Sequence, residues 1–269
     1  MAFITILWHK YVEKILLLNT EVNTMKKNIT AIISLSLIIG YPALASHHGH
    51  DHKNDEALKI ITNDNEYLTN INLMKGHLWV GMELYKASKI DNAKKHMKHP
   101  KSELYGDMVL TFEAKGAPGF ASELKIMASS VEDEAPLKTI NNHYQILFKA
   151  INKNEKFINQ TSSSNDKKIE LVISLLEIAA DEYAIGIVKG KVENKYEYQD
   201  ALGFTTMAKN ILEDITTEGA TEKERLSKII SVLDSLALLW PELVPNLNVD
   251  GDAKTILEAI VEIKKHTSI

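Results

Sequence analysis

The sequence predicts an all-α protein with two antiparallel helical bundles packed together, and three observations lead to this fold class. Apolar residues recur at spacings of three and four along most of the chain after residue 56, as they do on one face of a helix. No stretch alternates apolar and polar residues for long enough to indicate a strand. A polar segment at residues 160–166 divides the periodic part into two halves, each long enough for roughly four helices.

Composition excludes several classes of protein. The chain has 269 residues, with 31 Lys and Arg against 36 Asp and Glu, and it contains no cysteine. Without cysteine there is no disulfide, thiolate nucleophile, zinc ribbon or iron–sulfur cluster. The formal net charge of −5 argues against a nucleic-acid partner, which requires a basic face.

The first 45 residues are predicted to lie outside the fold, as an upstream segment followed by a secretory signal peptide. Positive charge at residues 26–27 precedes an apolar run at 29–39, and Ala43-Leu44-Ala45 fits the small-residue cleavage rule. Cleavage is expected after Ala45, and the expected location is the periplasm of a Gram-negative bacterium. No later apolar run reaches membrane length, so we expect no membrane span in the mature chain.

A histidine-rich tail at residues 46–55 would then begin the mature chain, with His47, His48, His50 and His52. If Ser46 is the new N-terminus, its amine, two backbone amides and the His48 imidazole form a square-planar set of nitrogens. That geometry suits Cu(II) or Ni(II). The alternative is a solvated tail whose histidines bind metal only adventitiously.

Helices are expected in order along both halves. The segment 65–90 is apolar nearly all round, which predicts a central, buried helix. In the second half, apolar stripes run through 169–187 and 201–215, and Asn194 three residues before Glu197 indicates a helix start. The expected helices of the first domain, 56–160, and of the second, 166–269, are 56–62, 65–90, 91–98, 101–115, 119–130, 134–158, 166–189, 195–217, 221–240 and 251–266.

Histidines in the first half are candidate ligands of an internal metal site. His77 lies on the apolar helix with Gly81 about one turn away, where a small residue allows close approach. His96 and His99 have the spacing that puts two rings on one helix face. Pro100 is expected to end that helix and leave His99 at a corner, with Glu103 in the next first turn.

Structural alternatives exist for each of these residues. His77 is also explained as a core histidine that is hydrogen-bonded to a neighbouring helix. His96 and Glu103 both complement helix dipoles at the ends where they are expected. His143 is a lone histidine that could complete a site from another helix. In the second half, Glu197 is explained by a capping box on Asn194.

Two resemblances add to this interpretation. One stretch resembles a group of uncharacterised exported helical proteins of Gram-negative bacteria, through Gly76-His77-Leu78-Trp79-Val80-Gly81, His96-Met97-Lys98-His99-Pro100 and Glu103-Leu104-Tyr105. Another is similar to the periplasmic helical extension of some bacterial iron permeases, through Glu182-Tyr183, Gly190-Lys191-Val192-Glu193-Asn194, Glu197-Tyr198-Gln199-Asp200 and Phe204. The transmembrane Arg-Glu-x-x-Glu motifs of those permeases are absent, so the second resemblance implies a soluble metal-handling accessory and gives weight to Glu182, Glu193 and Glu197.

The leading hypothesis is therefore a periplasmic metal-binding accessory protein for a copper or iron ion. Its tail would capture metal, and His77, His96, His99 and Glu103 would form an internal site. Its expected partners are the metal ion and an envelope protein or transporter. The competing hypothesis is a metal-free helical module that docks an envelope partner or a haem-like ligand. An enzyme is the third hypothesis, because no set of residues supplies nucleophile, base and orienting group together.

Overall fold

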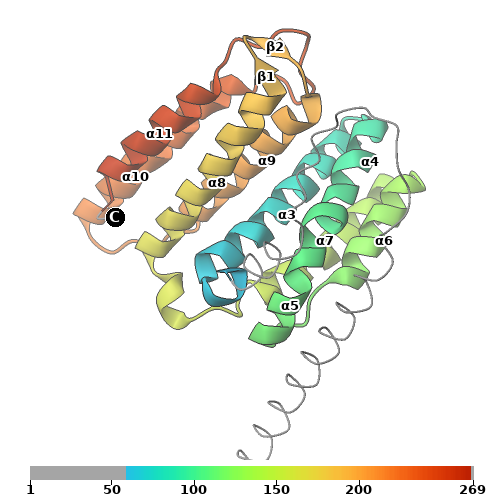
Figure 1. The fold of residues 1–269 in the computed structure, drawn as a ribbon, viewed down its shortest axis with the longest axis horizontal. Coiled ribbons are helices and arrows are strands. Elements are labelled where there is room, and N and C mark those ends of the chain that lie inside the picture. Colours follow the sequence, from blue (N-terminus) through green and yellow to red (C-terminus); the bar gives the residue numbers. More distant parts are fainter. Residues whose placement is uncertain (1–58, 268–269) are drawn as a thin grey trace, which may run out of the picture. The chain divides into compact units, whose positions relative to one another are not determined.

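The computed structural model describes residues 59–267, and within that range the chain is helical with one small sheet (Figure 1). The all-α prediction is thereby confirmed. The predicted signal peptide, the cleavage site at Ala45 and the tail with His47, His48, His50 and His52 lie outside the described residues. Among residues 59–267, no helix combines the length and the apolar character needed to cross a membrane.

The first half begins with residues 59–62, which are helical, and continues with five longer helices. The Asn63 side chain accepts hydrogen bonds from the first turn of α3, and Gly116 ends α5 in the left-handed conformation with φ 69°. These helices are α3 (Asp64–Lys86), α4 (Ile90–His99), α5 (Gly106–Lys115), α6 (Ala121–Glu132) and α7 (Leu137–Asn154).

The second half contains four α-helices, three of which start at side-chain caps. Ser164, Asn194 and Asp252 each accept a hydrogen bond from a backbone N–H of the first turn. The helices are α8 (Asn165–Gly186), α9 (Lys195–Glu213), α10 (Ala220–Ser235) and α11 (Ala253–Lys265), with short 3₁₀ turns η2 (Gln160–Ser163) and η3 (Leu236–Leu239).

The predicted helix 166–189 was too long, because α8 ends at Gly186 and a small sheet follows it. Strand β1 (Ile187–Val188) replaces the last residues of that predicted helix and pairs antiparallel with β2 (Lys191–Val192). Lys189 and Gly190 join them with φ values of 53° and 75°. Positive φ at both turn residues matches the twist of a tight hairpin, and glycine adopts it without strain.

The expected corner at His99 was also wrong. His99 is helical, with φ −53° and ψ −49°, and the chain continues through the π-helical segment η1 (Pro100–Tyr105) into α5. A proline inside an α-helix removes one hydrogen bond and clashes with an earlier carbonyl. A π-helical stretch shifts the hydrogen-bond register, and such stretches are frequent at functional sites.

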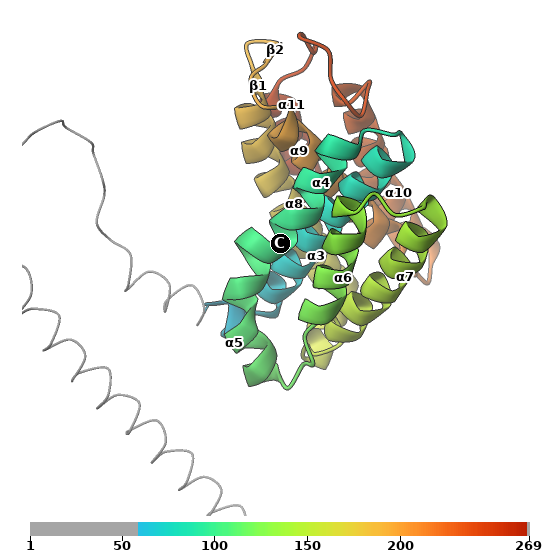
Figure 2. The ribbon, with the colours of Figure 1, turned by 90° about the vertical axis from the view of Figure 1, so that its right-hand side faces the viewer.

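Helix α3 lies between two hydrophobic clusters, as its apolar sequence predicted. One cluster draws its residues mainly from α8 to α11 and includes Leu73 of α3. The other is formed by α3 to α7, and Leu68 and Trp79 of α3 pack against both. Figure 2 shows α3 beside α4, with α8 and α9 behind it. Helix α3 therefore presents side chains to helices of both halves.

Candidate metal centre

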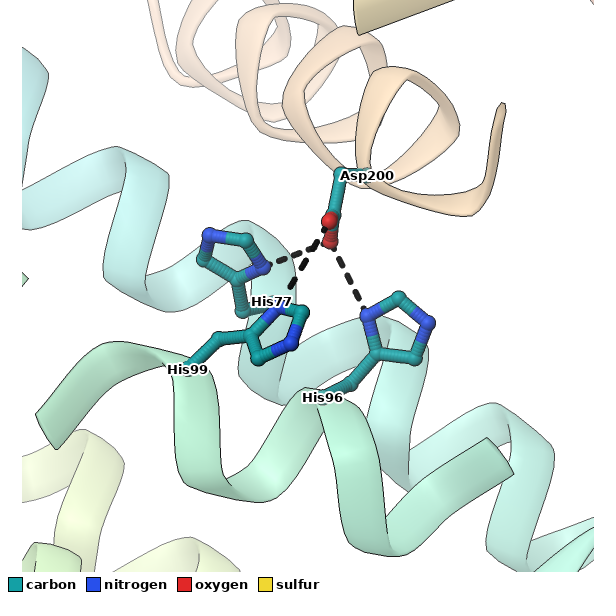
Figure 3. A group of neighbouring side chains, drawn as sticks. All are labelled: His77, His96, His99 and Asp200. Carbon is teal, nitrogen blue, oxygen red and sulfur yellow. Dashed lines mark hydrogen bonds and ion pairs between the residues drawn. The ribbon is translucent and has the colours of Figure 1, made fainter. Parts of the chain in front are cut away.

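Four side chains from three helices converge on one point (Figure 3). They are His77 on α3, His96 and His99 on α4, and Asp200 on α9, and each offers a ligand atom within 4.8 Å of the others. Within residues 59–267, this is the one group of three or more His, Asp or Glu side chains that meets this condition. The second half therefore contributes one ligand atom and the first half contributes three.

Two glycines allow α3 and α9 to approach closely enough for His77 to face Asp200. A Cβ atom at Gly203 would lie 2.7 Å from the Gly76 carbonyl oxygen and 2.8 Å from a methyl group of Val80. Both distances are shorter than a carbon atom tolerates, so only glycine fits at this crossing. His77 follows Gly76 directly, and Asp200 lies one turn before Gly203 on the same face of α9.

A third glycine places α4 against α3. A Cβ atom at Gly81 would lie 2.8 Å from the terminal methyl group of Met97, so the absence of a side chain makes room for Met97. His96 precedes Met97, and His99 lies three residues after His96 on the same helix face. Helix packing at these glycines thus brings both α4 histidines towards His77.

The Asp200 carboxylate is the centre of the group, and the Nδ1 atom of each ring faces it. Oδ1 lies 2.5 Å from His77 Nδ1 and 2.9 Å from His96 Nδ1, and Oδ2 lies 3.7 Å from His99 Nδ1. The His96 contact has hydrogen-bond geometry and is a hydrogen bond when Nδ1 carries a proton. The other two contacts are close ion pairs without hydrogen-bond geometry, so Nδ1 of His77 and Nδ1 of His99 are buried with no hydrogen-bond partner among the described residues.

Electrostatics keep Asp200 ionised. Its side chain is 2% exposed, and burial alone would raise the pKa of its carboxyl group. The facing imidazoles of His77, His96 and His99 outweigh burial and hold that pKa well below its usual value. In turn, contact with Asp200 raises the pKa of His99 against the effect of burial. The site is a buried anion surrounded by nitrogen atoms.

A pocket of about 290 Å³ opens beside the group and carries further carboxylates. Burial, a hydrogen bond to Glu197 and repulsion from Glu197 raise the pKa of Glu182 to about 8. At neutral pH Glu182 therefore retains its proton, which it shares with Glu197 in the hydrogen bond. The pocket is lined by Leu73, His77, Lys95, His99, Glu103, Leu104, Ile178, Glu182, Tyr196, Glu197, Asp200 and Phe204.

The comparison with known families bears on the helix that carries Asp200. Residues 159–268 match the iron permease-associated 4-helix bundle domain. This match contains α8, α9, α10 and α11, and it confirms the resemblance of the second half to the helical extension of iron permeases. Comparison with curated proteins and with solved structures gave no match. The second half is thus similar to an iron permease-associated helical domain that supplies Asp200, while the three histidines lie outside the match.

The predicted ligands are only partly brought together. His77, His96 and His99 converge, whereas Glu103 stands beside them, with its Oε1 3.9 Å from His99 Nε2 and its side chain 56% exposed. His143 lies elsewhere and pairs with Ser130.

The acidic residues of the matched domain lie in different places. Glu182 and Glu197 line the pocket, and Glu193 is exposed outside it. Glu197 also accepts a hydrogen bond from the side chain of Asn194. Asn194 is the N-cap of α9, as the capping alternative predicted. Asp200 was not among the predicted ligands, although an acid one turn before a helix glycine was a usable signal.

Proposed function

We propose that the chain is a metal-binding accessory protein that holds an iron or copper ion at His77, His96, His99 and Asp200. The observation that carries the proposal is the set of ring nitrogens around one buried carboxylate, two of them without a hydrogen-bond partner among the described residues. Buried polar atoms are normally hydrogen-bonded, and buried charges are normally paired or bound to metal.

The chemistry of the donor atoms supports a first-row transition metal. Imidazole nitrogen suits iron, copper, nickel and zinc, whereas a site for magnesium or calcium is built from oxygen atoms. Three imidazoles and one carboxylate therefore favour a transition metal over a hard cation. The match of residues 159–268 to an iron permease-associated domain favours iron among these metals.

The adjacent pocket supports an exchangeable cargo rather than a permanent structural ion. Structural metal sites are closed by their protein ligands, whereas exchange needs an open side. Here His77, His99 and Asp200 line a pocket that also presents Glu103, Glu182 and Glu197. The negative charge of Glu103 and of the Glu182–Glu197 pair attracts a hydrated cation to the mouth of the site.

The proposed partner is a membrane transporter, and the proposed location is the periplasm. The family description supports a role beside an iron permease. The export signal predicted at residues 25–45 supports the location, and the predicted tail at residues 46–55 would bring copper or iron to the protein. Cell fractionation and cross-linking to envelope proteins test these two parts.

Metal titration tests the site itself. The full chain, with His47, His48, His50 and His52 changed to Gln, is titrated with Fe²⁺ without oxygen and separately with Cu²⁺. We expect one equivalent of metal per chain. Asp200→Asn and His96→Gln, which preserve side-chain size, should each lower the affinity by about 10-fold or more because each loses one ligand.

His143→Gln is the matched control, because His143 is a partly buried histidine that pairs with Ser130 away from the group. It should bind metal as the parent chain does. The proposal fails if the parent chain binds neither metal, or if Asp200→Asn and His96→Gln bind as tightly as His143→Gln.

A further inference from the structure

The second ring nitrogen of His96 is held by a residue that is not part of the four-residue group. His96 Nε2 lies 2.9 Å from Gln199 Oε1, and Gln199 Nε2 donates to the Leu243 carbonyl oxygen at 2.9 Å. A carbonyl oxygen only accepts hydrogen bonds, so the amide nitrogen of Gln199 must face Leu243. Its oxygen therefore faces His96, and His96 Nε2 must carry the proton that it donates.

This chain of hydrogen bonds fixes the tautomer of His96. In the neutral ring with a proton on Nε2, the lone pair is on Nδ1. That atom lies 2.9 Å from Asp200 Oδ1, which is also an acceptor, so either a second proton or a cation must lie between the two atoms. His96 is fully buried and the Asp200 side chain is 2% exposed, so solvent would do little to relieve the repulsion between a bare Nδ1 lone pair and the carboxylate. A metal cation shared by Nδ1 and the carboxylate takes the place of the second proton and is attracted to both atoms.

We propose that Gln199 is a positioning residue that makes His96 Nδ1 a metal ligand. The inference rests on the proposed function and deepens it by assigning the ligand atoms. They are Nδ1 of His77, His96 and His99 with the Asp200 carboxylate. The ligand class is a divalent first-row transition cation. Metal-bound histidines commonly donate their second N–H to a fixed acceptor, which sets ring orientation and basicity.

The acceptor is itself held rigidly. Trp240 Nε1 donates to the Tyr198 carbonyl oxygen at 2.9 Å, and the Tyr198 hydroxyl donates to the Glu242 carbonyl oxygen at 2.9 Å. These bonds fasten the segment after η3 to the first turns of α9, next to Gln199. The Leu243 carbonyl oxygen is thereby kept in place, and it prevents the Gln199 amide from turning over.

Nuclear magnetic resonance of the ¹⁵N-labelled full chain tests the assignment. The four tail histidines, His47, His48, His50 and His52, are changed to Gln, and Zn²⁺ serves as the diamagnetic probe. We expect His96 in the Zn²⁺ form to show a proton on Nε2 and metal on Nδ1. Ligation through Nε2, or a proton that stays on Nδ1, overturns the proposal, and this result does not depend on any variant at Gln199.

A variant adds an affinity measurement. Gln199→Met has similar length and removes the acceptor, so His96 should populate both tautomers and Fe²⁺ affinity should fall about 10–100-fold. Gln145→Met, at an exposed position on α7, is the matched control and should bind as the parent does. Thermal melting of both variants checks folding.

The two proposals fail in different ways. A parent chain that binds neither Fe²⁺ nor Zn²⁺ overturns the proposed function together with the assignment. If the parent chain binds metal, and the folded Gln199→Met variant keeps the same affinity and the same His96 tautomer, only the role of Gln199 is overturned.

Discussion

Substitution of Gly203 by alanine should weaken metal binding without touching a ligand. The new Cβ atom would lie 2.7 Å from the Gly76 carbonyl oxygen and 2.9 Å from the Gly76 carbonyl carbon, both of which are backbone atoms. Backbone atoms do not rotate away as a flexible side chain does. Helices α3 and α9 must therefore move apart until these contacts become ordinary ones of about 3.4 Å, which requires a separation of about 0.7 Å.

Two effects of this movement differ in size. Overpacking costs about 1–3 kcal/mol, while alanine in place of glycine stabilises a helix by about 1 kcal/mol, so the net loss of unfolding free energy is about 0–2 kcal/mol. The same movement separates His77 from Asp200. Metal–ligand distances hold within about 0.2 Å, so a shift of about 0.7 Å should lower metal affinity about 10-fold or more.

Urea unfolding of the metal-free chain and titration with Fe²⁺ measure the two effects separately. Gly106→Ala is the matched control, because Gly106 is helical, with φ −58° and ψ −41°, and a Cβ atom there has no neighbour within 4 Å. It should be neutral or stabilising and should bind metal normally. Wild-type affinity in folded Gly203→Ala would refute the view that the glycine crossing sets the His77–Asp200 distance.

Two further predictions concern carboxylates outside the four-residue group. The Asp64 carboxylate accepts hydrogen bonds from Lys115 at 2.6 Å and from Ser162 at 2.7 Å, and also from the backbone N–H of Asn159. Burial alone would raise the pKa of Asp64, but these three hydrogen bonds outweigh it and lower that pKa from 3.8 to about 2. Asp64→Ala should cost about 2–3 kcal/mol of unfolding free energy at pH 7 because it leaves Lys115 unpaired. The difference from wild type should shrink as pH falls from 3.8 towards 2, and a difference that urea unfolding finds constant with pH would contradict this account. The raised pKa of Glu182, about 8 against 4.5, means that the folded state retains a proton that the unfolded state releases, so stability should fall as pH rises between these values. Glu182→Gln should flatten that part of the profile, and an unchanged slope in thermal melting from pH 5 to 8 would count against it.

The helices were predictable because their determinants are local. Apolar residues at spacings of three and four, and caps such as Asn194, act within one or two turns. The hairpin at residues 187–192 was missed because Ile187 continues the apolar stripe of α8, while the turn at Lys189 and Gly190 depends on positive φ values at both positions. The π-helical segment after His99 was missed because a proline usually ends a helix, and register shifts of this kind depend on tertiary packing.

The candidate site was predictable in part for a related reason. The spacing of His96 and His99 and the apolar surroundings of His77 are visible in the sequence, so three of the four converging side chains were among the predicted ligands. Asp200 lies 101 residues after His99 in sequence number and meets it only because α9 crosses α3 at Gly76 and Gly203. Packing between the two halves of the chain sets this crossing, and a local sequence pattern carries no information about such packing. Glu103 was predicted as a ligand on the same local spacing, but it lines the pocket beside the group and its side chain is 56% exposed.

X-ray absorption at the iron edge tests the central claim most directly. The full chain, with His47, His48, His50 and His52 changed to Gln, is loaded with one equivalent of Fe²⁺ without oxygen, and its spectrum is compared with that of Asp200→Asn. The account predicts nitrogen and oxygen neighbours at about 2.0–2.2 Å, with the outer-shell scattering of about three imidazole rings, and a weakened oxygen contribution in the variant. A chain that retains no iron, or iron whose spectrum shows no imidazole scattering, would contradict it.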